Sequence, residues 1–438
     1  MAILIASSVP SLRLSCFESS CQETFSGLNI CICFIMFPEP YRVVLCICRA
    51  NLKPKESQGM KTSALRVALL VEFASGGGAL TYAKQLLTYC ASRGFDTEIF
   101  PFGPVDELIE GAVRERPGVR AEEASAAREA IARYGRNPVG YHVETRRLTK
   151  TVLSMDRPVD LVISSVCSPG RFLHVGAGAV PHVQILHSYP RGWKHALGGF
   201  AFRSYAKQTN LIGVSQTVVE TMSRMWHLPM AREPAVLRNT VGPMVTNPRG
   251  FSGRTNQVLA VGAVTKQKDP LKFVRLASRV LERGVAPPGL TFVWLGDGPL
   301  LTAARDAVSE LGLENAVFFP GFIPDPAPWY HNSRVFLHTS SVDSLPLSVL
   351  DAFRFGLPAV VTDAGGLPEM MGESLQSSVI SRDNQEAMVQ ALEELLCDPG
   401  LWAQKADAVR ERYQEGYSPT RWEQDLDRMI WKVQSLSN

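Results

Sequence analysis

TSSVDSLPLSVLDAFRFGLPAVVTDAGGLPE, residues Thr339–Glu369, is the stretch around which the chain is organised. It carries two carboxylates, Asp343 and Asp351, separated by an apolar run that contains Pro346. Because a proline needs no N–H partner at the first position of a helix, we expect a helix to begin near Pro346. Free N–H groups and the positive dipole end of a helix bind phosphate, and nearby carboxylates accept hydrogen bonds from sugar hydroxyls. The stretch therefore favours a ligand in which a sugar is joined to a phosphate.

Apolar strands alternate with amphipathic helices on both sides of this stretch. In the first half, strands are expected at 65–73, 97–100, 159–164, 183–186 and 211–214, with helices between them. After a polar linker at 246–253 the alternation restarts, with strands at 258–261, 291–295, 316–319, 335–337 and 359–361. Such alternation predicts an α/β protein with two Rossmann-like, doubly wound domains facing across a cleft. We expect these domains at residues 60–245 and 254–415, followed by a C-terminal helix in 416–438 with one apolar face.

The first 59 residues differ from the rest of the chain. Six of the nine cysteines precede Asn51, and Met60 stands five residues ahead of the first strong strand. We expect residues 1–59 to be a non-native or disordered extension, translated from upstream of the natural start. The alternative is an uncleaved membrane-tethering segment, because residues 28–37 are apolar over about half the length of a membrane span.

Composition limits the class of protein. A net charge of +3 gives no argument for nucleic-acid binding. The three scattered cysteines of the body indicate reduced packing residues of a cytoplasmic protein. The C-x-C pairs near the N-terminus lack the spacing of zinc sites, so no metal is expected.

Three loops carry groups suited to an anionic ligand. Gly76-Gly77-Gly78 follows the first strand, but Thr81 stands where a dinucleotide motif has its third glycine, which disfavours an NAD site. The loop after Val261 carries Lys266 and Lys268, suited to a phosphate. Gly296 and Gly298, after the next strand, would let a nucleoside approach the backbone. Each loop has an alternative interpretation without a ligand. The glycine loop would be a tight turn, the lysines would be solvated, and the loop of Gly296 and Gly298 would be a common type of turn.

Two further features lie in the first half. His187 ends an apolar strand, where it is placed to hydrogen-bond a substrate hydroxyl or to transfer a proton. The alternative is a structural histidine. Residues 191–207 interleave aromatic and basic side chains, a pattern typical of a helix lying on anionic lipid. The alternative is a helix lining the cleft.

Taken together, these motifs resemble family 4 of the glycosyltransferases, the group 1 transferases with the GT-B architecture, from about Leu65 to Lys432. The pair Asp343 and Asp351 occupies the family's E-x7-E motif. Other matching motifs, in order, are Gly77-Gly78, His187, Val214-Ser215, Arg238-Asn239, Gly296-Asp297-Gly298-Pro299, Phe319-Pro320-Gly321-Phe322 and Gly365-Gly366-Leu367-Pro368-Glu369.

The resemblance implies a retaining glycosyltransferase that uses a nucleotide-diphosphate sugar and no metal or other cofactor. It implies an acceptor-binding first domain and a donor-binding second domain, for polysaccharide or glycoconjugate biosynthesis with a glycan or lipid-linked acceptor. Asp343 would hold the donor sugar, Asp351 the ribose and Lys268 the diphosphate, with His187 near the departing phosphate. The remaining donor contacts implied are Gly77, Gly78, Gly296, Gly298, Leu345 and Leu347.

Three departures from the family pattern define the alternatives. Both carboxylates are Asp rather than Glu, Pro346 has no N–H to donate, and Ala263 stands where the family has an arginine, with Lys266 as a partial substitute. A second hypothesis is therefore a catalytically degenerate subunit that binds or scaffolds. A third makes Asp343 and Asp351 the acid and base of a glycosidase. The expected location is the cytoplasm, with peripheral contact at the inner face of the membrane.

Overall fold

The computed structural model describes residues 30–36, 43–49, 65–72, 78–102, 158–166, 180–188, 210–226 and 235–435. The chain divides into two compact units, Met1–Ser63 and Ala64–Asn438. In the first unit, β1 (Ile30–Met36) and β2 (Val43–Arg49) pair antiparallel. Residues 105–155, whose helical periodicity predicts outer helices between the second and third strands, lie outside the described residues.

The second unit begins with a parallel six-stranded sheet in the order β4-β3-β5-β6-β7-β8. Residues Val67–Val71 at its centre are fully apolar and buried, as required of a strand covered on both faces. The described helices between its strands are α1 (Gly78–Ser92) and α6 (Gln216–Trp226). Its strands are β3 (Arg66–Glu72), β4 (Asp96–Phe102), β5 (Leu161–Val166), β6 (His182–Leu186), β7 (Asn210–Gly213) and β8 (Ala235–Val236).

A second parallel six-stranded sheet follows, in the order β11-β10-β9-β12-β13-β14. The predicted fold class, two doubly wound α/β sheets, is confirmed. The strands of this sheet are β9 (Gln257–Val261), β10 (Thr291–Leu295), β11 (Val317–Gly321), β12 (Val335–His338), β13 (Ala359–Thr362) and β14 (Val379–Ile380). Its α-helices are α7 (Pro270–Glu282), α8 (Leu301–Glu310), α9 (Ala327–Asn332), α10 (Leu347–Arg354), α11 (Leu367–Met371), α12 (Gln385–Cys397) and α13 (Pro399–Gly416). Short 3-10 helices lie at Phe251–Gly253 and Glu373–Ser378.

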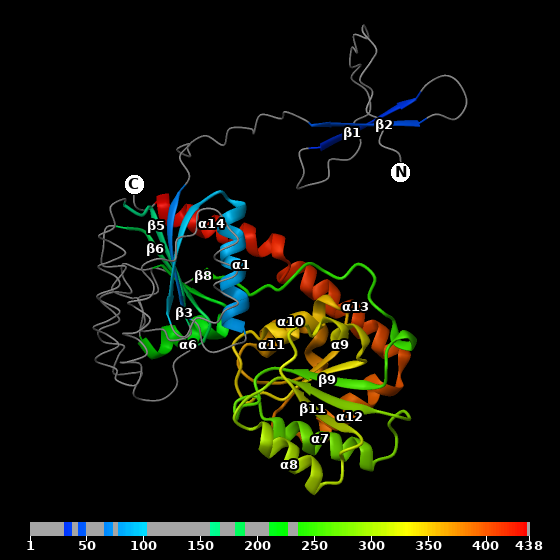
Figure 1. Ribbon diagram of the computed structural model, residues 1–438. Coiled ribbons are helices and arrows are strands. Elements are labelled where there is room, and N and C mark those ends of the chain that lie inside the picture. Colours follow the sequence, from blue (N-terminus) through cyan, green and yellow to red (C-terminus); the bar gives the residue numbers. More distant parts are fainter. Residues whose placement is uncertain are drawn as a thin grey trace. The chain divides into compact units, whose positions relative to one another are not determined.

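The helices of the second sheet are sorted onto its two faces (Figure 1). Helices α7, α8 and α12 share one apolar core with the sheet. Helices α10, α11 and α13 belong to the other core. Local sequence explains where several helices begin: Asp269 and Asp398 cap α7 and α13, and each is followed by a proline at the first helical position.

The strand order places one switch point in the second sheet. The chain runs outward from β9 to β10 and β11, then returns to β12 on the other side of β9. In open parallel sheets, ligands bind beyond the carboxyl ends of the strands at this point. The loops after β9 and β12 carry Lys268 and Asp343, so the topology brings two predicted site residues to one edge.

The last helix, α14 (Pro419–Ser435), returns to the first sheet. Its apolar residues join the core that contains β3, β5 and β6. Trp422 is 4% exposed, and its ring meets Tyr82 and Tyr89 of α1 edge to face at centroid distances of 5.9 and 5.6 Å. The apolar face predicted for this helix therefore covers the first sheet domain.

Candidate functional site

Hydroxyl groups join the loop that follows β12 to the loop that follows β9. Thr339 Oγ1 donates to the carbonyl of Lys268 at 2.8 Å, and Ser340 Oγ and Ser341 Oγ donate to that of Gln267 at 3.0 Å. The Ser341 amide donates to the same Gln267 carbonyl at 2.8 Å. The two loops thus form one rigid edge of the sheet.

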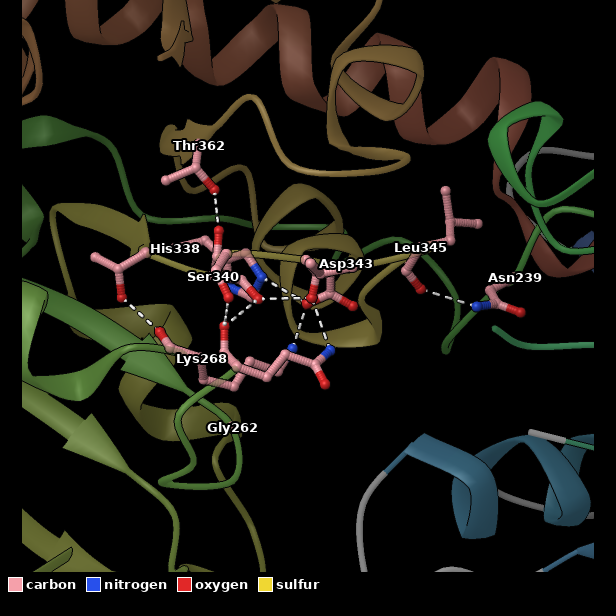
Figure 2. Close-up of polar contacts among 12 residues, drawn as sticks. Asn239, Gly262, Lys268, His338, Ser340, Asp343, Leu345 and Thr362 are labelled. Atoms are coloured by element: carbon pink, nitrogen blue, oxygen red, sulfur yellow. Dashed lines mark hydrogen bonds and ion pairs between the residues drawn. The ribbon is translucent and has the colours of Figure 1, made fainter. Parts of the chain in front are cut away.

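Lys268 and His338 converge on the carboxylate of Asp343 (Figure 2). Lys268 Nζ and Asp343 Oδ2 form an ion pair. His338 Nε2 lies 2.9 Å from the same Oδ2. The side chains are 18%, 13% and 4% exposed for Lys268, Asp343 and His338, so the cluster is largely shielded from water but open at Lys268.

This cluster keeps Asp343 ionised. Burial alone raises the pKa of the Asp343 carboxyl, but the charge of Lys268 and the hydrogen bond from His338 outweigh it, and the pKa lies well below its usual range. Burial, followed by the charge of Lys268, lowers the pKa of His338 against the opposing effect of Asp343. At neutral pH Asp343 is therefore a carboxylate and His338 a neutral imidazole.

The turn at Gly365 and Gly366 supports Asp343 from behind. The Gly366 amide donates to the Asp343 carbonyl at 2.8 Å. A Cβ at Gly366 would lie 1.8 Å from the carbonyl oxygen of Ser344, so only glycine permits this approach. Asp343 is therefore held through its backbone as well as its side chain.

Helix α10 begins at Leu347, with Pro346 as its N-cap, as the sequence predicted. Gly78, the first residue of α1, faces this helix start: a Cβ there would lie 3.4 Å from Leu347 Cδ1. Two helix N-termini thus meet beside the Lys268 and Asp343 loops. The earliest amides of a helix lie ahead of its internal hydrogen bonds, which in α10 begin with the Val349 amide donating to the Pro346 carbonyl at 3.3 Å, and such a start suits a phosphate group.

Asp351 lies one turn further along α10. Its Oδ1 accepts a hydrogen bond from Arg354 Nε at 2.7 Å. Burial raises the pKa of Asp351 despite that partner. The residue lines a cavity of about 580 Å³ bounded by α1, α9, α10, α14 and the segment 240–243. Asp343 does not line that cavity, so the two carboxylates have different surroundings.

Two glycines predicted to lie near a nucleoside have a packing requirement of their own. A Cβ at Gly296 would lie 2.0 Å from the carbonyl oxygen of Gly262, and one at Gly298 would lie 2.6 Å from that of Val264. Both therefore let the loop after β10 lie directly against the loop after β9.

Residues of the first half dock onto the Asp343 loop and the turn behind it. Asn239 Nδ2 donates to the Leu345 carbonyl at 2.9 Å. The Glu369 carboxylate accepts from the Gln216 amide at the start of α6, at 2.7 Å, and pairs with Arg238 at 3.2 Å. The position of the Asp343 loop thus depends on both sheet domains.

Comparison with known proteins identifies the second domain. A profile of the family described as "Glycosyl transferases group 1" matches residues 246–415. Residues 246–415 belong to the group 1 glycosyltransferases. A relative with matching sequence is the 2-deoxystreptamine N-acetyl-D-glucosaminyltransferase of Streptomyces fradiae, 31% identical over 32% of this chain and 33% of its own length. Another is the UDP-Gal:alpha-D-GlcNAc-diphosphoundecaprenol alpha-1,3-galactosyltransferase of Escherichia coli, 26% identical over 30% of this chain and 34% of its own length.

The likeness in fold extends further than the likeness in sequence. The Anabaena protein HepE in complex with UDP-glucose superposes with a TM-score of 0.65 at 16% identity, over 84% of this chain and all of its own. The chain therefore has the GT-B fold. By sequence, the chain spans between 28% and 48% of the length of the curated relatives it matches first.

His187 follows β6 at the carboxyl edge of the first sheet. Its Nε2 lies 2.9 Å from Ser165 Oγ, and its ring meets that of Tyr82 edge to face at 4.3 Å. Burial lowers the pKa of His187 to about 4. The side chain is consequently neutral at physiological pH and serves as a hydrogen-bonding group rather than a cation.

Other predicted site residues are exposed or lie outside the described residues. Ala263 and Lys266 are both exposed on the loop after β9. Gly77 and residues 191–207 lie outside the described residues. Among the described residues, no group of three histidine, cysteine, aspartate or glutamate side chains is arranged to hold a metal ion. None of the described helices is long and apolar enough to cross a membrane.

Sequence reasoning missed His338. The residue reads as the end of a buried apolar strand, and its spacing from Asp343 has no recognisable motif. One sequence feature could have identified His338 as a site residue: it stands at the carboxyl end of the strand that leads directly to Asp343. The same criterion had selected His187.

Proposed function

We propose that this protein is a retaining glycosyltransferase that moves a sugar from a nucleotide-diphosphate donor to a glycan or lipid-linked acceptor. The observation that carries the proposal is the Lys268 and Asp343 pair at the switch point of the group 1 glycosyltransferase domain. Three kinds of group lie at one edge of the sheet, and each suits one feature of a sugar phosphate. The lysine suits its negative charge, the carboxylate its sugar hydroxyls and the helix N-terminus its phosphate oxygens.

In this proposal each group has a defined task. Lys268 and the first-turn amides of α10 balance the negative charge that develops on the diphosphate as the glycosidic bond breaks. Asp343 accepts hydrogen bonds from hydroxyls of the donor sugar, and Asp351 from those of the ribose. His187, uncharged, lies near the donor sugar and the departing phosphate. The acceptor hydroxyl attacks from the leaving-group face, so the chain supplies no nucleophile.

We assign the acceptor to the first domain and peripheral membrane contact to residues 191–207. The Escherichia coli relative, which is named for a diphosphoundecaprenol acceptor, supports a lipid-linked acceptor. The interleaved aromatic and basic side chains of 191–207 support an anionic membrane surface at the cytoplasmic face. Flotation with anionic vesicles tests this assignment: the protein should float with them, and remain unbound with vesicles of neutral lipid.

A second candidate function is a degenerate subunit that binds but does not transfer. Ala263 favours it, because this exposed loop position supplies no cation to the diphosphate. The glycosidase hypothesis is disfavoured, since Lys268 and His338 both engage the carboxylate of Asp343 and Arg354 engages that of Asp351.

Thermal unfolding in a panel of UDP-, GDP- and ADP-sugars tests the main proposal. A donor at a hundred times its Kd stabilises the folded state by about 2.7 kcal/mol, which raises the midpoint by several degrees. The shift should disappear in Lys268→Ala and persist in Lys405→Ala, which removes a lysine of α13 that donates to Ser377 Oγ at 2.6 Å, away from the Asp343 loop. Binding without transfer or donor hydrolysis would favour the degenerate subunit.

A further inference from the structure

His338 is the most deeply buried member of the Asp343 cluster. It is the last residue of β12, and its ring stacks against that of Phe336 at a centroid distance of 6.3 Å and an angle of 16°. The stacking fixes the direction of the ring, and the strand fixes its backbone. Its Nε2 therefore points at Asp343 from a rigid support, whereas Lys268 reaches the same oxygen through a flexible side chain.

The chemistry of the partners defines the direction of the hydrogen bond. Asp343 is ionised and can only accept, so His338 carries its proton on Nε2 and donates. Lys268 and His338 both use Oδ2. Oδ1 is thereby left for a further donor, such as a sugar hydroxyl.

Donor binding would weaken the ion pair between Lys268 and Asp343. A diphosphate carries more charge than one carboxylate and competes with Asp343 for the ammonium of Lys268. Asp343, only 13% exposed, would then be a buried carboxylate with a weakened ion pair, which is costly unless another donor stays in place.

We propose that His338 is a positioning residue that keeps Asp343 oriented and ionised when Lys268 turns to the donor diphosphate. The identity of the ligand in this inference rests on the proposed function. The coupling of His338, Asp343 and Lys268 is present in the protein without ligand and can be measured there. Asp343 and Lys268 are the charged groups that act on His338: the lysine opposes protonation of the ring and the carboxylate favours it.

The first experiment compares two variants at one position. His338→Gln retains an N–H donor of similar reach, whereas His338→Leu has similar bulk and no donor. Calorimetric affinity for the sugar nucleotide that stabilises the wild type should fall at least tenfold in His338→Leu, the effect of one hydrogen bond to a charged group, and recover to within about threefold in His338→Gln. Equal affinities of wild type and His338→Leu, or equal losses in both variants, would overturn the proposal.

The second experiment needs no donor and no folded His338 variant. In ¹⁵N spectra of histidine-labelled protein, His338 should show the neutral form protonated at Nε2. In Lys268→Ala, the uncompensated Asp343 charge should raise the midpoint of the His338 titration. His182, buried in the first sheet and 2.8 Å from Ser164 Oγ, provides the unresponsive control.

The two experiments separate the two hypotheses. Failure of the wild type to bind any sugar nucleotide would reject the proposed function, and the spectra would still decide the His338 coupling. A His338 midpoint identical in wild type and Lys268→Ala would overturn the coupling even in a protein that binds donor.

Discussion

Asn239 donates a 2.9 Å hydrogen bond from its side-chain amide to the carbonyl oxygen of Leu345, 106 residues further along the chain. The bond is buried, and Leu345 stands two residues before α10 and two after Asp343 (Figure 2). The segment that leaves the first sheet therefore holds the loop on which the donor is expected to bind.

Replacement of Asn239 by leucine should loosen that loop. It removes the donor and leaves a buried carbonyl without a partner, at a cost of about 1–3 kcal/mol in unfolding free energy. Urea unfolding measures the loss. The control is Asn256→Leu, which removes a bond of 2.8 Å to the Pro288 carbonyl at an exposed site. Equal stabilities of the two variants would contradict the role given to Asn239.

Gly296→Ala should be among the most destabilising substitutions in the second domain. The new Cβ would lie 2.0 Å from a backbone oxygen, and φ is +148°, so the loop after β10 must separate from the loop after β9. We expect a loss of at least about 2 kcal/mol, measured by urea unfolding. Gly250→Ala, where a Cβ meets nothing within 4 Å, should stay within about 0.5 kcal/mol of the wild type.

Acid should destabilise the protein through His187. Its folded pKa of about 4 lies below the ordinary 6.5, so the unfolded state binds a proton more readily. The contribution of His187 to the unfolding free energy is fully present above pH 6.5. It is lost as the pH falls towards 4, by up to about 3 kcal/mol. In His187→Gln, whose amide retains a hydrogen bond to Ser165, unfolding free energies at pH 7.5 and 5 should differ less than in the wild type. An unchanged difference would be evidence against the neutral, half-buried state of His187.

Arg254 should be needed for the stability of the second domain although it pairs with no carboxylate in the described part of the chain. It is 4% exposed and donates to the carbonyls of Arg249, Tyr330, Ser333 and Phe355 at 2.8–2.9 Å. Burial lowers its pKa to about 10. Arg254→Met should cost at least about 3 kcal/mol in urea unfolding, because several buried acceptors lose their partner. Arg279→Met, which removes an exposed pair with Glu386, should cost less than about 1 kcal/mol.

The two carboxylates should differ in which part of the donor they recognise. Asp343→Asn should weaken binding of a sugar nucleotide by at least tenfold, but leave binding of the free nucleotide unchanged or tighter, because Lys268 is released. Asp351→Asn should weaken both equally. Calorimetry with the nucleotide identified in the panel measures the four affinities. A parallel loss of both ligands in Asp343→Asn would argue against its assignment to the donor sugar.

The local sequence was sufficient to predict most of the strands and longer helices of the second sheet domain. Its strands are short apolar runs and its longer helices have clear amphipathic patterns with side-chain caps, as at Asp269 and Asp398. The short helices α9 (Ala327–Asn332) and α11 (Leu367–Met371) were not predicted, since five or six residues give too little periodicity. Their conformation is set by packing against the sheet.

The site was predictable where the chain topology alone brings residues together. Lys268 and Asp343 follow strands that flank the switch point, so their proximity follows from strand order. His338 and Asn239 could not be found this way, because their roles depend on where one side-chain nitrogen points after folding. Gly296 and Gly298 were interpreted as ligand contacts, and the structure gives each a packing reason that spacing does not reveal.

The return of α14 to the first sheet has a consequence for synthesis on the ribosome. Trp422, Leu426 and Ile430 are buried in the core of a domain whose last strand, β8, ends at Val236. At roughly 5–20 residues per second, the interval between Val236 and Pro419 takes on the order of ten to forty seconds. During that time the nascent first sheet lacks part of its apolar cover, while the second domain, whose elements are contiguous in sequence, is translated and can close. The later half of the chain is thus expected to reach its native packing before the earlier half.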